Sequence, residues 1–282
     1  MRLLLLTGLA MLAFAANSLL NRLALAEAAI GPASFAAIRV GSGALVLLSL
    51  LCLRQGRWPD LPRPEPWSVL GLAAYMLGFS FAYVSMDAGL GALVLFGGVQ
   101  LTMFLGAVIE GDRPAPRRWL GMALSMAGLA VLSLPGGELH IAPFALASMG
   151  LAALGWGIYS LRGRRAGDPL AATAWNFLYC LPLMLVVLPL WPDGTPASWA
   201  GIGLAVLSGA VTSGLGYALW YALLPALGAS RGALAQLSVP VLALALAALL
   251  LGEAIGGLAV VSAAMILGGI ALGLTGGTGR RG

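Results

Sequence analysis

The sequence is divided almost completely into apolar runs that are about as long as a bilayer is thick, and short segments join them. Ten runs can be delimited, near residues 3–21, 33–53, 67–86, 89–109, 118–134, 141–161, 170–190, 201–223, 230–251 and 254–275. About 20 apolar residues in a helix cross the hydrocarbon core with every backbone polar group bonded internally. We therefore predict an all-α membrane protein of ten transmembrane helices.

The composition excludes a soluble protein. Only 9% of the residues are charged and the mean hydropathy is +0.97, whereas soluble domains carry roughly 25% charged residues. The basic residues are all Arg and are dispersed, so nucleic acid binding is not expected. Cys52 and Cys180 lie inside apolar runs and are interpreted as packing residues, with no disulfide or metal site.

The distribution of arginines predicts the orientation of the chain. With a cytoplasmic N-terminus, 13 of the 15 arginines fall inside, while Arg22 falls outside and Arg39 lies within the second helix. Cytoplasmic loops carry an excess of basic residues. We therefore expect a multi-pass protein of the bacterial inner membrane with both termini in the cytoplasm. The start, MRLLLLTGLAMLAFAA, is similar to a signal peptide, but its match to a later segment assigns it to the fold.

That match belongs to an internal repeat. A shift of 142 residues places Phe14 on Trp156, and the same shift places Tyr75 on Tyr217. The predicted units are residues 1–137 and 138–282, each with five helices in one compact membrane domain. Because five is odd, the second unit enters the membrane inverted, which is a transporter architecture. A duplication kept only for packing is the alternative.

Aromatic residues mark a candidate substrate site. Buried Tyr and Trp need a partner for their polar atom, which lipid does not supply. These side chains should face neighbouring helices or a cavity suited to flat or amphipathic solutes, although packing alone would also explain them. The candidates are Tyr75, Phe79 and Tyr83, spaced by four residues, with Trp156, Tyr159 and Tyr217. Trp220 and Tyr221 cluster with Tyr217 on the eighth predicted helix.

Polar residues inside the predicted helices extend this site. Asn17 and Gln100 are the amides chosen to hold polar groups of a solute, although an amide can equally bond across helices. Arg39 is the only charge deep within a helix, which makes it a candidate to attract or gate an anionic group. It lies about six residues from the outer end, so its long side chain could instead extend to the interface.

Glycine and proline suggest paired helix interruptions. Gly97 and Gly98 interrupt the fourth predicted helix, and Pro240 interrupts the ninth. Interruptions at corresponding places in two repeats point to a binding site in transporters, and we assign these residues to gating or hinge roles together with Arg39. An ordinary packing kink is the alternative for Pro240.

The residues that proton relays, cation sites and hydrolysis require are not apparent in the sequence. All ten Asp and Glu residues fall in loops or at helix ends, so no proton relay or cation cage is visible. The sequence has no Walker A loop and no hydrolytic Ser/His or paired-Asp set. We therefore expect no enzyme activity and no cofactor, and we favour facilitated efflux or exchange.

The chain resembles the drug/metabolite transporter superfamily in its EamA-type ten-helix branch. The resemblance is carried by AAIRVGSGALVLL around Arg39, AALGWGIYSLRGRR around Trp156, SGAVTSGLGYALWYAL around Tyr217 and SVPVLALALAALLLGE from Pro240 onward. It implies an inverted-repeat fold with a central cavity and export of metabolites, most similarly to the YddG-type aromatic amino acid exporters. One departure is Gly97, which stands where the first half would carry the counterpart of Pro240.

Together these observations predict an exporter of small organic solutes, neutral or aromatic amino acids foremost. The first, third, fourth, sixth, eighth and ninth helices should line the cavity. The partners implied are a small-molecule substrate and the lipid bilayer, and a monomer is compatible with the sequence. Export of other metabolites or drugs, a membrane enzyme and a non-transporting scaffold remain the alternatives.

Overall fold

The regular structure of the chain is helical wherever the chain is described. The computed structural model describes residues 1–109, 115–133, 142–163, 166–194, 196–220, 222–223, 226, 235–236, 238–252 and 254–275. Within these ranges ten helical segments correspond to the ten predicted runs. They are α1 (Arg2–Ala26), α2 (Pro32–Gln55), α3 (Pro66–Ala82), α4 (Ala88–Ile109), α5 (Pro116–Ser133), α6 (Pro143–Gly163), α7 (Pro169–Leu190), α8 (Trp199–Leu207) continued by π-helical η1 (Ser208–Leu215), α10 (Ser238–Leu246) continued by π-helical η2 (Ala247–Leu251), and α11 (Gly257–Thr275).

Proline begins many of these helices. Its fixed φ suits the first helical turn, where its missing N–H would have no partner in any case. Two of these starts have an acidic cap as well: the Glu65 carboxylate accepts from Ser68 N at 2.6 Å, and the Asp168 carboxylate accepts from Ala171 N at 3.2 Å. The prolines at helix starts are Pro32, Pro66, Pro116, Pro143 and Pro169.

Three predicted helix ends were wrong by several residues. The first helix ends at Ala26 rather than near 21. The third helix ends at Ala82 rather than near 86, and residues 83–86 form a turn. The last helix begins at Gly257 rather than near 254, because Gly252 takes a left-handed conformation (φ 66°) that ends η2. The first residues of the predicted 230–251 helix lie mostly outside the described residues.

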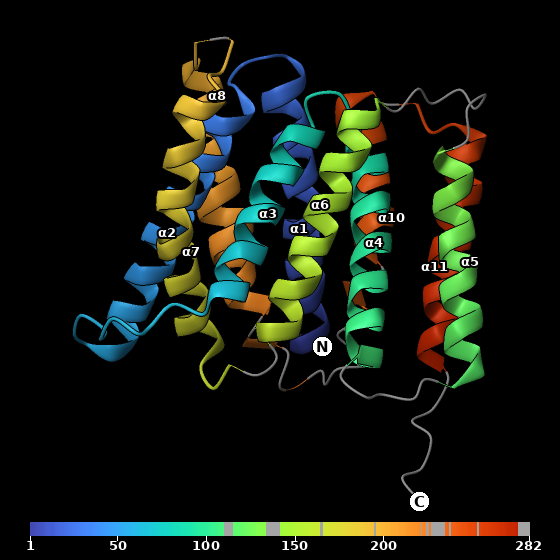
Figure 1. Cartoon of the computed structure of the whole chain (residues 1–282), viewed down its shortest axis with the longest axis horizontal. Coiled ribbons are helices and arrows are strands. Elements are labelled where there is room, and N and C mark those ends of the chain that lie inside the picture. Colours follow the sequence, from blue (N-terminus) through green and yellow to red (C-terminus); the bar gives the residue numbers. More distant parts are fainter. Residues whose placement is uncertain are drawn as a thin grey trace, which may run out of the picture.

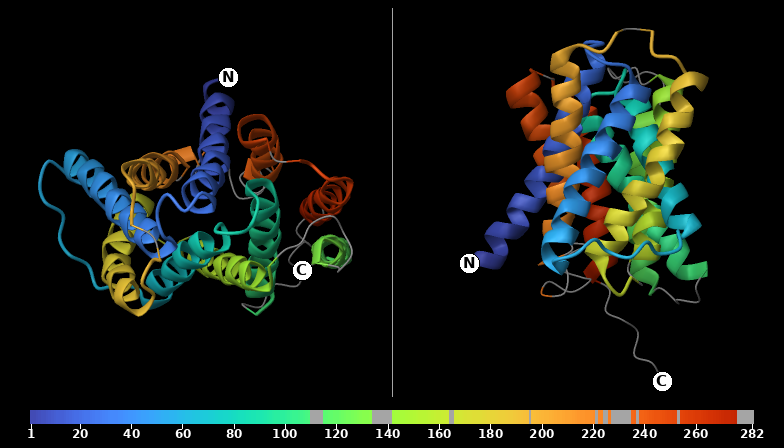
Figure 2. Two further views of the ribbon diagram at one scale, coloured as in Figure 1. Left: turned by 90° about the horizontal axis from the view of Figure 1, so that it is seen from above. Right: turned by 90° about the vertical axis from the view of Figure 1, so that its left-hand side faces the viewer.

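The helices form one bundle in which distant parts of the sequence lie side by side (Figure 1). α2 packs against α7 and η1, α6 packs against α3 and α4, and α1 packs against α8, η1 and α10. The start of α1 and the end of α11 lie at the same end of the bundle, and the first turns of α1 lean away from the other helices (Figure 2). This arrangement fits an even number of crossings.

Glycines permit two especially close helix contacts. In the α3–α6 pair, a Cβ at Gly71 would lie 2.8 Å from the Gly155 carbonyl oxygen. In the α5–α11 pair, Gly121 and Gly269 face each other in the same way, and Ser125 donates to the Ile266 carbonyl oxygen at 3.2 Å. Small residues at such contacts let membrane helices approach closely. The α5–α11 pair lies at the edge of the bundle (Figure 1).

Several helices are suited to cross a membrane. Six helical spans within the described ranges are at least 18 residues long and strongly apolar, and three more apolar helices are shorter. Many large apolar side chains lie on the outside, including Leu4, Leu53, Ile109 and Leu249, all at least 75% exposed. An exposed apolar surface of this kind is matched by lipid and not by water.

Candidate functional site

A small cavity lies among α1, α3, α4, α6 and the helix that contains η1. Its volume is about 20 Å3, which is close to the room needed for one water molecule. α10, the predicted ninth helix, contributes no lining residue in the described chain. The lining residues are Phe14, Asn17, Ser18, Tyr75, Phe79, Leu95, Phe96, Trp156, Thr212 and Tyr217.

Aromatic rings form most of the wall. The ring centroid of Trp156 lies 4.8 Å from that of Tyr75 and 5.0 Å from that of Tyr217. Phe14 meets Tyr217 edge to face at 5.7 Å, and Phe79 lies 5.3 Å from Tyr75. Aromatic pairs at these separations attract one another through their quadrupoles. The rings come from four helices, two in each half of the sequence, and present stacking surfaces to the cavity.

The cavity also has a polar wall, built by α1 and η1. Asn17 Oδ1 accepts from Ser208 Oγ at 2.7 Å and from Thr212 Oγ1 at 2.9 Å. Asn21 Nδ2 donates to the Asn17 carbonyl oxygen at 2.8 Å. A π-helical turn changes the direction of side chains relative to an α-helix, and here the hydroxyls of Ser208 and Thr212 in η1 both point to α1. The Asn17 amide is therefore held in one orientation.

Arg39 is fully buried next to this cavity. Its Nε donates to Ser213 Oγ at 3.1 Å and its Nη2 donates to the Tyr75 hydroxyl at 2.9 Å. Its Cζ lies 5.2 Å from the ring centroid of Tyr75 and 5.1 Å from that of Phe79. The side chain does not extend to the outer interface. It is directed into the protein.

The structure separates the predicted binding residues into two groups. Five of them line the cavity: Asn17, Tyr75, Phe79, Trp156 and Tyr217. The other three, Tyr83, Gln100 and Tyr159, are not among its lining residues.

Two of these three have contacts that join helices. The Tyr83 hydroxyl donates to the Ala88 carbonyl oxygen at 3.2 Å across the α3–α4 turn. The Tyr159 hydroxyl donates to Thr173 Oγ1 at 3.2 Å and so joins α6 to α7. Gln100 lies half-buried on α4, and a binding role for it stays a prediction. Tyr221 lies outside the described residues.

The predicted interruption of the fourth helix is not found, and the one at Pro240 stays a prediction, because α10 begins at Ser238 and residue 237 lies outside the described residues. α4 runs without a break through Gly97 and Gly98, because glycine weakens a helix but keeps its N–H donor. Gly98 provides close packing instead, since a Cβ there would lie 2.7 Å from that of Ala153. Pro240 lies within α10, and α-geometry ends only at η2. Roles of these residues in movement stay predictions.

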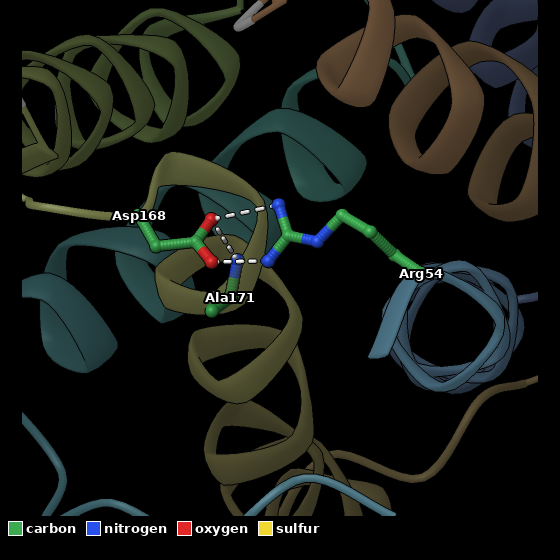
Figure 3. A network of polar contacts seen from close by, with 3 residues as sticks. All are labelled: Arg54, Asp168 and Ala171. Carbon is green, nitrogen blue, oxygen red and sulfur yellow. Dashed lines mark hydrogen bonds and ion pairs between the residues drawn. The ribbon is translucent and has the colours of Figure 1, made fainter. Parts of the chain in front are cut away.

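Polar contacts join the helices at both ends of the bundle. At the end of the bundle where α1 begins, the Arg54 guanidinium at the end of α2 forms a bidentate ion pair with the Asp168 carboxylate at the start of α7 (Figure 3). Hydrogen bonding from Arg54, assisted by the backbone N–H of Ala171, lowers the pKa of the Asp168 carboxyl. The pair joins one helix of each half of the sequence.

The opposite end has its own links. Arg22 on α1 pairs with Asp87 in the α3–α4 turn at 3.1 Å. The Asp193 carboxylate accepts from the backbone N–H groups of Ala33 and Ser34 at the start of α2, at 3.2 and 2.9 Å. Carboxylates stabilise helix N-termini in this way.

Sequence reasoning identified Asn17 but missed the hydroxyls of η1 that complete the polar wall. Ser208 and Ser213 had no assigned role, and Thr212 served only to mark the family motif. The signal in the sequence was the run SGAVTSG, which places three hydroxyls in six residues of an otherwise apolar helix. Hydroxyls in such a helix must bond to their own backbone or to a neighbouring helix.

Fold and site together define a polytopic, all-helical membrane protein with a small aromatic site at the centre of its bundle. A family comparison makes this more specific. The chain belongs to the EamA-like transporter family, whose model matches residues 1–134 and 144–275. The family confirms the transporter class that the motifs around Arg39, Trp156 and Tyr217 suggested.

Related proteins support the same class. An uncharacterized protein of Pseudomonas aeruginosa is 48% identical over 96% of this chain and 94% of its own length. A "Probable amino-acid metabolite efflux pump" of Salmonella typhimurium is 30% identical over 71% of this chain and 73% of its own length. A "Probable terminal-alkyne amino-acid exporter" of Streptantibioticus cattleyicolor is 28% identical over 85% of this chain and 82% of its own length.

A solved structure shares the fold. One protein crystal structure superposes with a TM-score of 0.67, at 22% sequence identity, and the match covers 96% of both chains. At this identity the likeness concerns the course of the chain and not its substrate.

Proposed function

We propose that this protein exports small neutral or aromatic amino acids across the bacterial inner membrane. The observation that carries the proposal is the central cavity, whose wall combines stacking rings with a fixed amide and has no acidic side chain among its described lining residues. Phe79, Trp156 and Tyr217 would stack on the substrate, and Asn17 would hold one of its polar groups. Two relatives named as an amino-acid metabolite efflux pump and an amino-acid exporter support this substrate class.

The proposed mechanism is alternating access between two inverted repeats, residues 1–137 and 138–282. A twofold pattern of helix contacts supports it: α2 with α7, α4 with α10 and α5 with α11 are each a pair of corresponding helices. Likewise α3 with α6 has its counterpart in η1 with α1, and α4 with α6 has its counterpart in α10 with α1. Two separate matches of the family model point the same way.

The size of the cavity implies that the helices must move. Sites that bind small molecules usually measure about 300–1,000 Å3, while this cavity holds about 20 Å3. A substrate can enter only if the helices around the site separate toward one side of the membrane. The ion pairs at the two ends of the bundle, Arg54–Asp168 at one end and Arg22–Asp87 at the other, would have to break in turn.

Counterflow in proteoliposomes tests the function directly. Purified protein is reconstituted, the vesicles are loaded with unlabelled amino acid, and labelled phenylalanine, tryptophan, threonine and alanine are added outside in turn. We expect labelled phenylalanine or tryptophan to accumulate without any ion gradient, as a facilitator or exchanger requires. Absence of flux for all four, with protein shown to be folded, would remove the amino acid proposal and direct the search to other metabolites.

A further inference from the structure

The charge of Arg39 has no counter-ion in the described part of the chain. Its Nε and Nη2 donate to the uncharged hydroxyls of Ser213 and Tyr75, and its Nη1 is buried with no hydrogen-bond partner. The side chain is 0% exposed. The ion pairs formed by described residues involve Arg22, Arg54 and Arg57 but not Arg39.

A buried guanidinium without a carboxylate is costly. Removing a charge from water requires compensation by an opposite charge or by several hydrogen bonds. The rings of Tyr75 and Phe79 offer a cation–π attraction, which offsets only part of this cost. Charged residues inside membrane helices usually mark substrate or ion pathways. Nη1, which has no partner among the described residues, therefore indicates a place for an anionic group that those residues do not supply.

Tyr75 connects this charge to the cavity. Its hydroxyl accepts from Arg39 Nη2 and is also hydrogen-bonded to the hydroxyl of Tyr217, a second ring of the cavity wall. Tyr75 and Phe79 both line the cavity and both contact the guanidinium. The guanidinium Cζ is 5.2 and 5.1 Å from the centroids of these two rings, and in a low-dielectric interior a charge acts strongly over a short distance.

The polar wall completes a set of donors. Because Asn17 Oδ1 already accepts from Ser208 and Thr212, the Nδ2 group is what its amide can still offer to a substrate. The lining residues include no Asp or Glu. The surroundings of the cavity thus combine positive charge and N–H and O–H donors, and they favour an acceptor group with negative charge.

We propose that Arg39, acting with Tyr75, forms a subsite for the carboxylate of the substrate. This inference rests on the proposed function and narrows its substrate class: the carboxylate is required for binding, whereas the amino group is not. The aromatic wall receives the apolar part of the same molecule. An aromatic carboxylate without an amino group should bind, and an aromatic amine without a carboxylate should not.

The test compares four compounds that share a phenyl ring. Binding is measured on the purified full-length protein in detergent as a thermal shift, since a ligand that binds only the folded state raises its stability. Phenylalanine and 3-phenylpropionate carry the carboxylate, while phenylalaninamide and phenethylamine lack it. We expect the two carboxylates to bind about tenfold or more tightly than the other two, as the loss of a charge-assisted pair implies.

Variants show whether Arg39 is responsible. In Arg39→Gln the preference for carboxylates should fall about tenfold, while Arg57→Gln, a change at an exposed loop arginine, should keep it. If Arg39→Gln does not fold, Tyr75→Phe serves instead, because it keeps the ring and removes only the hydroxyl. The proposal would be overturned if the folded Arg39→Gln protein kept its preference for carboxylates. If Tyr75→Phe is used in its place, an unchanged preference in that variant would have the same consequence.

The two proposals fail in different ways. Binding of all four compounds with equal affinity, or of none of them, rejects the carboxylate subsite whatever counterflow shows. Binding that prefers carboxylates, combined with absence of amino acid flux, supports the subsite and rejects amino acid export, so that other aromatic carboxylates become the substrates to examine.

Discussion

At the scale of single residues, Trp156 contributes the largest stacking surface of the cavity. It lies between Tyr75 and Tyr217 at centroid distances of 4.8 and 5.0 Å. Trp156→Ala should lower phenylalanine counterflow about tenfold or more, since a stacked base or ring on an aromatic side chain contributes roughly 1–3 kcal/mol. Trp199→Ala is the matched control, because Trp199 is 89% exposed at the start of α8. Normal transport by folded Trp156→Ala would contradict the assignment.

How much of the site could be predicted differed by residue type. Aromatic residues stand out in an apolar sequence, and a shift of 142 residues along the sequence is enough to relate Tyr75 to Tyr217. Tyr83 and Tyr159 have the same chemistry but contact other helices. Whether a tyrosine faces the cavity depends on the rotation of its helix, and a helix that is apolar on all sides leaves no pattern from which to read it.

At the scale of elements, the α3–α6 contact depends on glycine. A Cβ at Gly155 would collide with the Gly71 carbonyl oxygen and lie 2.6 Å from Tyr75 N, and backbone cannot move aside as a side chain can. We expect Gly155→Ala to cost about 1–3 kcal/mol, the usual penalty for overpacking. Gly150→Ala on the same helix meets nothing within 4 Å and should be neutral.

The measurement for this pair of variants is thermal unfolding in detergent, followed by monodispersity on size exclusion. Since Gly155 lies next to Trp156, a displaced α6 should reduce transport as well. Equal unfolding temperatures for Gly155→Ala and Gly150→Ala would show that the two helices are free to separate.

Helix ends and irregularities were not equally predictable. Prolines at helix starts and glycines after helix ends have local effects, so most boundaries follow from the sequence. The π-helical segments η1 and η2 do not, because their extra residue per turn is stabilised by neighbouring helices. The Ser208 and Thr212 bonds to Asn17 are such stabilising contacts. The expected break at Gly97 was wrong because local weakness alone did not interrupt α4.

The Arg54–Asp168 pair between α2 and α7 should make stability depend on pH. Because Arg54 lowers the pKa of Asp168, the ionised carboxylate stabilises the fold; this contribution is complete above the unfolded pKa, about 3.9, and is lost as pH falls through the folded pKa. Both side chains are over 40% exposed, so the effect should stay below about 1 kcal/mol and weaken with salt.

Asp168→Asn isolates this contribution, because Asn still caps α7. The variant should unfold at a slightly lower temperature than the wild type at pH 7. Plotted against pH, the unfolding temperatures of the two proteins should converge below about pH 4. Asp60→Asn, which breaks an ion pair whose Arg57 and Asp60 side chains are 65% and 87% exposed, should change nothing. A difference that persists unchanged in acid would assign the effect of Asp168 to something other than its charge.

At the scale of the whole molecule, the sequence predicted helix number more readily than arrangement. Apolar length alone identifies a crossing, whereas the partner of each helix depends on surfaces that are apolar on every side. Contacts such as that of α2 with α7 were not predicted from the sequence, although the proposed internal repeat makes these two helices counterparts. Orientation in the membrane comes from the arginine distribution, which acts during insertion and leaves no contact in the folded bundle.

Orientation can be tested at the two ends of α7. Gly167 precedes this helix and Gly194 follows it, and a Cβ at either position meets nothing within 4 Å. In a background with Cys52 and Cys180 replaced by Ala, Gly194→Cys should react with a membrane-impermeant maleimide in intact bacterial cells. Gly167→Cys should react only after the inner membrane is permeabilised. If neither cysteine variant is labelled in intact cells and both are labelled after permeabilisation, α7 does not cross the membrane. The reverse pattern would place the arginine-rich side and both termini outside the cytoplasm, so that the proposed direction of export would have to be abandoned.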